Sequence, residues 1–135
     1  MNLRIPYWAK SGGVVSVNGQ HTANTQLKAH SLRSLNRKWN DGDTLELSLP
    51  MPLHLHAMPD DGNLVALMVG PVVLAGLSDD ELTYKGTPAQ LIDAVKPVEG
   101  KPLTYALESA GKTITFKPLY RVVDESYGVY VRTGK

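Results

Sequence analysis

The chain has 135 residues, of which 42% are hydrophobic, and it contains 12 glycines, 9 prolines and no cysteine. This composition is typical of a turn-rich globular protein and excludes a disordered chain, a disulfide framework and a thiolate metal site. Fourteen basic residues against 13 acidic residues give a net charge of +1. So small a net charge does not favour nucleic acid or an anionic membrane as a partner. The longest apolar run, at residues 64–75, is too short to span a bilayer.

Alternating apolar and polar residues in the first half of the chain predict short antiparallel strands. Strands are predicted at residues 3–7, 14–17, 32–37, 44–49 and 53–57, with a loop at residues 21–29. Asn18-Gly19 predicts a hairpin, because both residues tolerate a positive φ. The sequence Asn-Asp-Gly-Asp at residues 40–43 predicts a second turn, because Asn and Asp side chains bond their own backbone there.

The second half of the chain predicts further strands and one helix. Residues 64–75 are apolar at nearly every position and predict one central strand covered on both faces. Gly70-Pro71 within that run predicts a bulge or bend, since proline donates no ladder hydrogen bond. Residues 87–95 are predicted to form one short helix, because Thr87-Pro88-Ala89-Gln90 has the capping-box pattern with proline at the first helical position. Strands are then predicted at residues 103–107, 112–119 and 127–132.

About nine short strands, frequent turns and a single helix predict an all-β fold, an antiparallel β-sandwich of the jelly-roll or immunoglobulin-like kind. We expect one domain over residues 1–135, because neither part alone would bury much core. Residues 76–100 mark the place where the sandwich could be divided from a small C-terminal β unit.

Two aromatic-rich motifs near the ends of the chain carry a resemblance to a known family. They are LRIPYWA at residues 3–9 and FKPLYRVVDESYGVY at residues 116–130, and residues 37–43, 47–52 and 65–76 continue the match in order and spacing. Together they resemble the C-terminal β-sandwich region of bacterial proteins of glycoside hydrolase family 127, the β-L-arabinofuranosidase-like group. In the last motif the family pattern has His, Arg and Trp where this chain has Val123, Ser126 and Val131.

The resemblance implies that catalysis takes place outside this chain. In the family the sugar chemistry belongs to an upstream α/α toroid, which uses a cysteine nucleophile beside a zinc ion held by cysteines and a glutamate. A chain without cysteine cannot hold that centre. We therefore expect a non-catalytic accessory domain of a larger glycoside hydrolase, with no catalytic residue, metal or cofactor of its own. Its expected partner is the upstream catalytic domain of the same polypeptide. A periplasmic or secreted bacterial parent is compatible with the resemblance, while the sequence itself fixes no compartment.

The two end motifs also indicate where such a domain would dock. The first motif lies where the chain would enter from the upstream domain, and the second lies at a predicted corner between the last strands. The predicted docking residues are Tyr7, Trp8, Tyr120, Arg121 and Asp124. Arg121 and Asp124 could pair across the corner, and a purely structural corner would use the same two residues.

An autonomous carbohydrate-binding module is the alternative function. Sugars stack on exposed aromatic rings, and Trp39 beside Arg37 at a turn is the best platform candidate. The competing interpretation is that Trp39 closes the end of the core. Tyr127 and Tyr130 are three residues apart on one predicted strand, so at most one of them could belong to a shared exposed stripe.

Histidines and carboxylates elsewhere do not predict a site. His54 and His56 lie on one face of a strand, but two histidines without a defined third ligand do not make a zinc site. His21 and His30 are expected at the surface. Acidic side chains that lie in turns keep ordinary acidity and do not form the acid/base pair of a glycosidase. Such runs occur at residues 60–61, 79–81 and 124–125.

Overall fold

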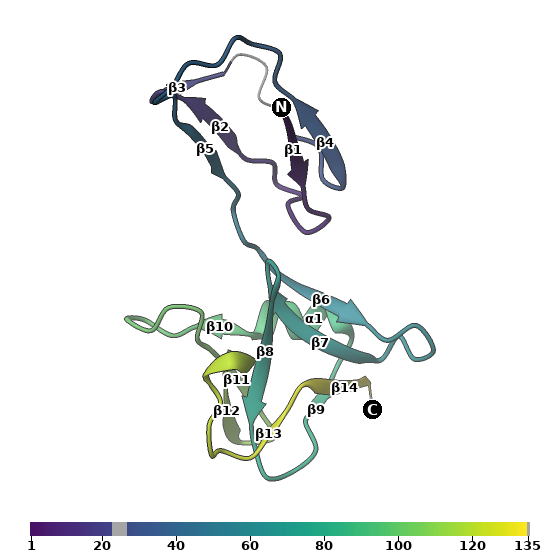
Figure 1. Cartoon of the computed structure of the whole chain (residues 1–135). Helices are drawn as coiled ribbons and strands as arrows, with labels where there is room; N and C mark the ends of the chain where they lie inside the picture. Colours follow the sequence, from purple (N-terminus) through teal and green to yellow (C-terminus); the bar gives the residue numbers. More distant parts are fainter. Residues whose placement is uncertain (23–26, 135) are drawn as a thin grey trace. The chain divides into compact units, whose positions relative to one another are not determined.

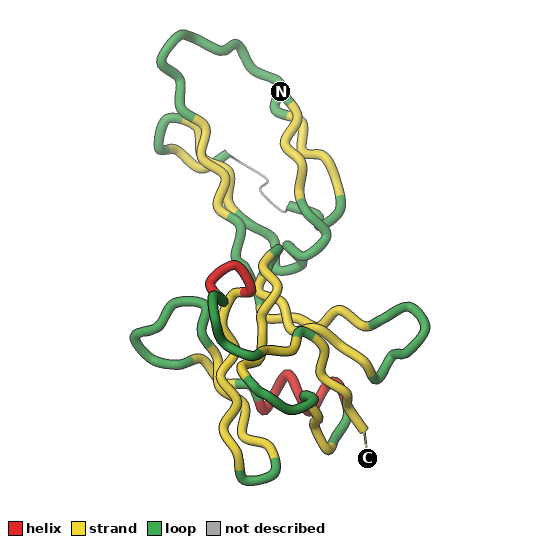
Figure 2. The backbone as a smooth tube through the Cα atoms, turned by 60° about the horizontal axis from the view of Figure 1, so that its bottom comes forward, coloured by secondary structure: helices red, strands yellow, loops and turns green. Residues whose placement is uncertain are grey.

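A computed structural model describes residues 1–22 and 27–134 (Figure 1). The chain divides into two compact units, Met1–Pro52 and Leu53–Lys135, called unit 1 and unit 2 below. Figure 2 shows that strands dominate both units and that helix is confined to short segments. The prediction of an all-β fold with one short α-helix is therefore confirmed. In the described ranges, no helix has the length and apolar character needed to cross a bilayer.

Unit 1 is built from two small antiparallel sheets. Its strands are β1 (Asn2–Ile5), β2 (Val14–Val17), β3 (Gln20–His21), β4 (Ser31–Ser34) and β5 (Leu45–Ser48). β1 pairs with β4, and β2 lies between β3 and β5. The inward side chains form one core, whose buried members are Ile5, Ala9, Val15, Leu27 and Leu35. The predicted strand at residues 32–37 is shorter than expected, and residues 23–26 of the predicted loop lie outside the described residues.

The two predicted turns of unit 1 are confirmed, and they contact each other. Asn18 and Gly19 have φ values of 51° and 78° at the tip of the β2–β3 hairpin. The backbone N–H of Asp43 donates to the carbonyl of Asn40 at 3.1 Å, which closes the second turn. The Asn18 side chain joins the two turns, because its Nδ2 donates to Asp43 Oδ1 and its Oδ1 accepts the N–H of Thr44, both at 2.9 Å.

Unit 2 is built on one nine-stranded sheet in its described part. Its strands are β6 (Leu53–Ala57), β7 (Leu64–Val69), β8 (Val72–Leu77), β9 (Thr83–Lys85), β10 (Lys96–Pro97), β11 (Tyr105–Ser109), β12 (Lys112–Pro118), β13 (Tyr127–Gly128) and β14 (Tyr130–Gly134). The main order is β10-β11-β12-β8-β7-β14-β9, with β13 beside β8 and β6 beside β7. Pairing is antiparallel except between β14 and β9. The core is centred on the fully buried side chains of Leu67, Leu74, Leu91, Leu107 and Phe116.

Residues 64–77 form a hairpin, so the prediction of one bent central strand was wrong. β7 and β8 pair with Val69 opposite Val72, which leaves Gly70-Pro71 as a two-residue loop. Gly70 has a φ of 53°, the positive value that the first residue of a type II′ hairpin loop requires. His54 on the adjacent β6 supports the loop, because its Nε2 lies 2.8 Å from the Gly70 carbonyl oxygen. Apolar residues at nearly every position are expected both for one long buried strand and for two buried strands joined by a tight turn.

The helix prediction is confirmed in detail. α1 (Pro88–Ala94) begins after the N-cap residue Thr87. The N–H of Gln90 donates to Thr87 Oγ1 at 3.3 Å, and the N–H of Thr87 donates to Gln90 Oε1 at 2.9 Å. Both partners of the capping box are thus satisfied, and Leu91 on the next turn is buried in the core. A 3₁₀ turn, η1 (Leu119–Arg121), follows β12 where the sequence predicted the strand to end.

The possible boundary at residues 76–100 lies inside unit 2. β8 and β12 come from opposite sides of that segment and pair directly, with Gly76 opposite Phe116. The boundary between the two compact units instead lies between Pro52 and Leu53. The expectation of one domain over residues 1–135 stays a prediction.

Candidate functional site

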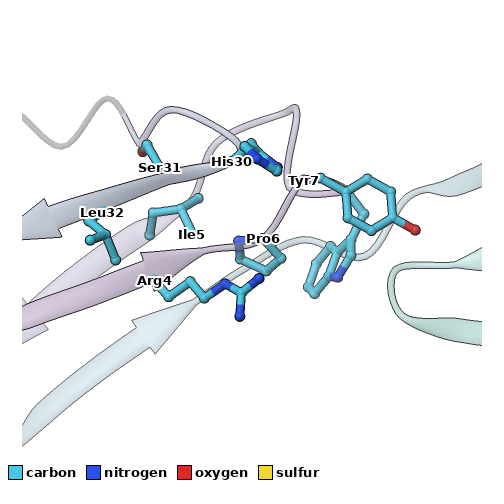
Figure 3. Close-up of a pocket in the computed structure, with 8 residues that line it drawn as sticks. Arg4, Ile5, Pro6, Tyr7, His30, Ser31 and Leu32 are labelled. Atoms are coloured by element: carbon cyan, nitrogen blue, oxygen red, sulfur yellow. The ribbon is translucent and has the colours of Figure 1, made fainter.

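Unit 1 contains an open pocket of about 690 Å³ at the end of the β1–β4 ladder (Figure 3). Antiparallel pairing of Arg4 with Leu32 and of Ile5 with Ser31 brings two distant stretches of sequence together there. The pocket is lined by Arg4, Ile5, Pro6, Tyr7, Trp8, His30, Ser31 and Leu32. Two of the predicted docking residues, Tyr7 and Trp8, therefore belong to a concave site.

Backbone contacts fix the shape of this pocket. The N–H of Ala9 donates to the Pro6 carbonyl at 3.2 Å, which closes a turn around Tyr7 and Trp8. The N–H of His30 donates to the same carbonyl at 3.3 Å. His30 has a φ of 58°, a left-handed conformation that non-glycine residues seldom adopt. Figure 3 shows the His30 imidazole and the Arg4 guanidinium on either side of Pro6.

The pocket combines aromatic surface with positive charge. Tyr7 is 46% exposed, and Trp8 is half-buried with its ring packed against the core of unit 1. No acidic side chain is among the lining residues. Within residues 1–22 and 27–134, no hydrogen bond or ion pair engages the Arg4 guanidinium. An anion entering the pocket would thus meet a charge that the described protein leaves uncompensated.

Sequence reasoning identified Tyr7 and Trp8 but missed Arg4 and His30. A signal for Arg4 was present, because it alternates with the inward Leu3 and Ile5 and so points away from the core. No comparable signal exists for His30, since its position depends on a left-handed backbone that only the folded chain reveals.

Trp39, the predicted sugar platform, packs half-buried against the core of unit 1. The central guanidinium carbon of Arg37 lies 4.8 Å from the centroid of its ring, and Arg37 Nη2 lies 3.3 Å from Asp43 Oδ2. The pKa of Asp43 is lowered by the N–H of Asn40 and the amide of Asn18, and further by the Arg37 charge. This geometry favours the interpretation that Trp39 closes the core. A glycan role for Trp39 and Arg37 stays a prediction.

The predicted corner of unit 2 is exposed. Tyr120, in η1, is 67% exposed and Val123 is 82% exposed. The guanidinium carbon of Arg121 lies 5.6 Å from the Tyr120 ring centroid, and Arg121 Nη1 donates to the Pro102 carbonyl at 3.5 Å. Asp124 is exposed on the same turn. The corner therefore presents an exposed aromatic side chain in contact with an adjacent cation.

Glu125, rather than Asp124, closes this corner electrostatically. The predicted Arg121–Asp124 pair does not occur among the described contacts; Glu125 Oε1 instead accepts from Lys117 Nζ. The second oxygen of Glu125 accepts the N–H groups of Val123 and Asp124 at 3.0 and 3.2 Å. The hydrogen bond from Lys117 and that from the backbone of Val123 lower the pKa of Glu125 to about 2.

Tyr127 and Tyr130 line one open groove of about 590 Å³, although their spacing predicted opposite faces. The predicted strand is interrupted at Val129, between β13 and β14, and this break changes the alternation. Four acidic side chains line the groove, and all of them except Asp79 form ion pairs with described residues. The pairs are Asp80 with Lys112, Glu81 with Arg132 and Glu125 with Lys117. The groove therefore offers less free charge than its sequence indicates.

No group of three or more His, Asp or Glu side chains in the described chain is arranged to hold a metal ion. The partly buried His54 instead makes the backbone contact at Gly70. Nor can the chain supply the thiolates of the zinc centre that the resemblance implies, because it has no cysteine.

Comparison with known families finds a similarity that is confined to the first unit. Residues 1–51 match the family model described as beta-L-arabinofuranosidase, GH127 middle domain. The match ends beside Pro52, the last residue of unit 1. The matching model describes a middle domain, whereas the resemblance in the sequence placed the chain in a C-terminal region.

Comparison with solved structures concerns both units. Six chains are similar to this one. One of them, a glycoside hydrolase, has a TM-score of 0.66 and 20% sequence identity, over 99% of this chain and 27% of that chain. No curated protein sequence matches the chain. The chain thus has the fold of about a quarter of a glycoside hydrolase, and its unit 1 pocket lies wholly within the segment that matches the GH127 middle domain.

Proposed function

We propose that the chain is a non-catalytic accessory domain of a larger glycoside hydrolase. The observation that carries this proposal is the coincidence of unit 1 with the segment that matches the GH127 middle domain. The similar glycoside hydrolase is also far longer than the aligned region. In such an arrangement the remainder of the polypeptide carries the catalytic groups.

The corner of unit 2 is the docking surface in this proposal. Tyr120 and Arg121 present an exposed aromatic–cation pair, and Val123 adds an exposed apolar side chain. Aromatic and arginine side chains are the residues that most often anchor protein interfaces. Asp124, also exposed, adds a charge at the rim. The corner would support the catalytic domain of the same polypeptide.

Tyr7 and Trp8 have a different role in the proposal. Both were predicted docking residues, but they line a pocket whose volume falls in the range of small-ligand sites. We assign Tyr7 and Trp8 to glycan binding, where they would form part of one wall of the substrate cleft of the enzyme. The glycan would be of plant or microbial type and would carry arabinofuranosyl units.

A hydrolysis assay tests whether the chain is non-catalytic. Aryl β-L-arabinofuranosides are incubated with the chain alone and with the full-length parent polypeptide, each with and without zinc. We expect turnover by the parent and none by the chain above a heat-denatured control. Turnover by the chain alone would remove the proposal.

An autonomous carbohydrate-binding module is the second candidate, and the unit 1 pocket is the observation that favours it. Deleting residues 1–135 from the parent separates the two functions. Loss of kcat or of thermal stability of the catalytic domain on a small aryl glycoside supports docking. Loss of activity confined to polymeric substrate supports the module.

A further inference from the structure

We infer that the unit 1 pocket binds an anionic sugar, whose carboxylate or sulfate pairs with Arg4 while the sugar ring lies against Tyr7 and Trp8. The choice of a sugar rests on the proposed function. The preference for an anion rests on the pocket alone.

The volume and walls of the pocket suit a sugar of one or two rings. About 690 Å³ lies within the range of small-molecule sites, roughly 300 to 1,000 Å³. One wall carries Tyr7 and Trp8, and Leu32, 66% exposed, adds apolar surface from β4. Aromatic side chains provide large apolar contact together with a polar edge, which matches the C–H faces and hydroxyl groups of a sugar.

The charge of the pocket selects an anion. Arg4 lines it without an ion pair to any described residue, and no carboxylate is present in the lining to compete for the guanidinium. A guanidinium matches the geometry of carboxylate and other oxyanions with two parallel hydrogen bonds. Next to apolar walls this pairing is stronger than in open water, because the local dielectric is lower.

The backbone that carries the polar side chains of the pocket is held in place before the ligand arrives. Arg4 lies on β1 opposite Leu32, and the backbone of His30 is tied to the Pro6 carbonyl. The imidazole of His30 therefore lies on the wall formed by the start of β4 and the residue before it, where it can bond sugar hydroxyls. The hydroxyl of Ser31 already donates to the Lys28 carbonyl, so it is left to the ligand only as an acceptor. A backbone that is ordered before binding costs less entropy than one that the ligand must order.

Titration of the ¹⁵N-labelled chain, followed by amide chemical shifts, tests the inference. The probes are digalacturonic acid, the neutral disaccharide of galactose, a galactose disaccharide sulfate and a capped diglutamate peptide. We expect shift changes confined to residues 4–9 and 30–32 for the acidic and sulfated sugars. The neutral disaccharide should bind about tenfold more weakly, because it lacks the charged group that pairs with Arg4.

Two variants and a matched control assign the contacts. Arg4→Met keeps the aliphatic stem and should reduce affinity for digalacturonic acid to that for the neutral sugar. Tyr7→Ala should weaken both sugars. Lys10→Met removes another exposed positive charge of unit 1, one that does not line the pocket, and it should leave binding unchanged.

Equal affinity for neutral and acidic sugars would overturn the inference, as would digalacturonic acid binding that survives Arg4→Met. Binding of the diglutamate peptide in preference to every sugar would also overturn it, because the pocket would then be a protein-docking site. Comparing the affinity for digalacturonic acid with that for the sulfated disaccharide shows whether the pocket prefers a carboxylate or a sulfate. None of these outcomes affects the hydrolysis assay, so the two proposals can fail separately.

Discussion

The guanidinium of Arg37 stacks on the indole of Trp39, with its central carbon 4.8 Å from the ring centroid, and it also pairs with Asp43. The same Asp43 accepts a hydrogen bond from Asn18 on the neighbouring hairpin. Trp39 packs against the unit 1 core beneath this network. Because Trp39 is half-buried under these contacts, we expect its main effect to be on the stability of unit 1.

Substituting Trp39→Ala should lower the free energy of unfolding of unit 1 by about 2 to 3 kcal/mol, because the ring is half-buried and its removal leaves a cavity. Urea unfolding followed by fluorescence measures this, since Trp8, the other tryptophan, also lies in unit 1. Lys38→Ala on the same turn serves as an exposed control. Unchanged stability combined with loss of glycan binding would show instead that Trp39 is a sugar platform.

Two variants at Asn18 separate the contribution of its side-chain hydrogen bonds to stability from that of its left-handed backbone conformation. Asn18→Gly should destabilise unit 1 by about 1 to 2 kcal/mol through the lost hydrogen bonds to Asp43 and Thr44. Asn18→Ala should cost about 1 kcal/mol more, since alanine tolerates a φ of 51° less well than glycine. Tryptophan fluorescence in urea gives both values. Equal stability of the two variants would mean that the backbone conformation of the turn does not matter.

Gly76 on β8 has no room for a side chain. A Cβ there would lie 2.8 Å from Leu82 Cδ1 and 2.8 Å from Phe116 Cε1, and both residues are buried in the unit 2 core. Gly76→Ala should therefore destabilise unit 2 by about 1 to 3 kcal/mol through overpacking. Gly62→Ala is the matched control in the same unit, because a Cβ at Gly62 meets nothing within 4 Å. Thermal unfolding followed by circular dichroism compares them, and equal midpoints would contradict the packing described for β8.

The corner of unit 2 should be sensitive to acid. The pKa of Glu125 is lowered from 4.5 to about 2, first by Lys117 and then by the backbone N–H of Val123. A carboxylate with a lowered pKa stabilises the folded state above its ordinary pKa. That contribution should be lost as the pH falls from about 4.5 to 2, and the loss should be absent in Glu125→Gln.

Carbon-detected NMR of the Glu125 carboxyl group gives the midpoint directly. We expect it near 2 in the unaltered chain and closer to 4.5 in Lys117→Met, which keeps the aliphatic stem without the charge. A midpoint near 4.5 in the unaltered chain would mean that the ion pair does not form in solution.

Features encoded by a few adjacent residues could be predicted from the sequence. Asn18-Gly19 requires positive φ values, and the structure has them. Thr87 and Gln90 are spaced as a capping box and form one. The alternation of Leu45, Leu47 and Leu49 places all three against the unit 1 core. In each case the physical requirement is met within a few residues.

Features that depend on distant parts of the chain could not be predicted in this way. In the apolar run at residues 64–75, Gly70-Pro71 marks a bend but does not show that the chain reverses there. The break at Val129 brings Tyr127 and Tyr130 to one groove. The parallel pairing of β14 with β9 likewise follows from the assembled sheet rather than from either segment. The pocket depends on the pairing of β1 with β4, so Arg4 and His30 could not be brought together from spacing alone.

Hydrogen–deuterium exchange tests the central claim, that this chain is a domain which docks on a catalytic domain through the corner at residues 119–124. Exchange is measured by mass spectrometry on the chain alone and on the full-length parent polypeptide. The account predicts slower exchange of residues 119–124 in the parent and unchanged exchange at the β11–β12 turn around Gly111. Tyr120→Glu in the parent should restore fast exchange at the corner. Equal exchange of the corner in the chain and in the parent would contradict the account.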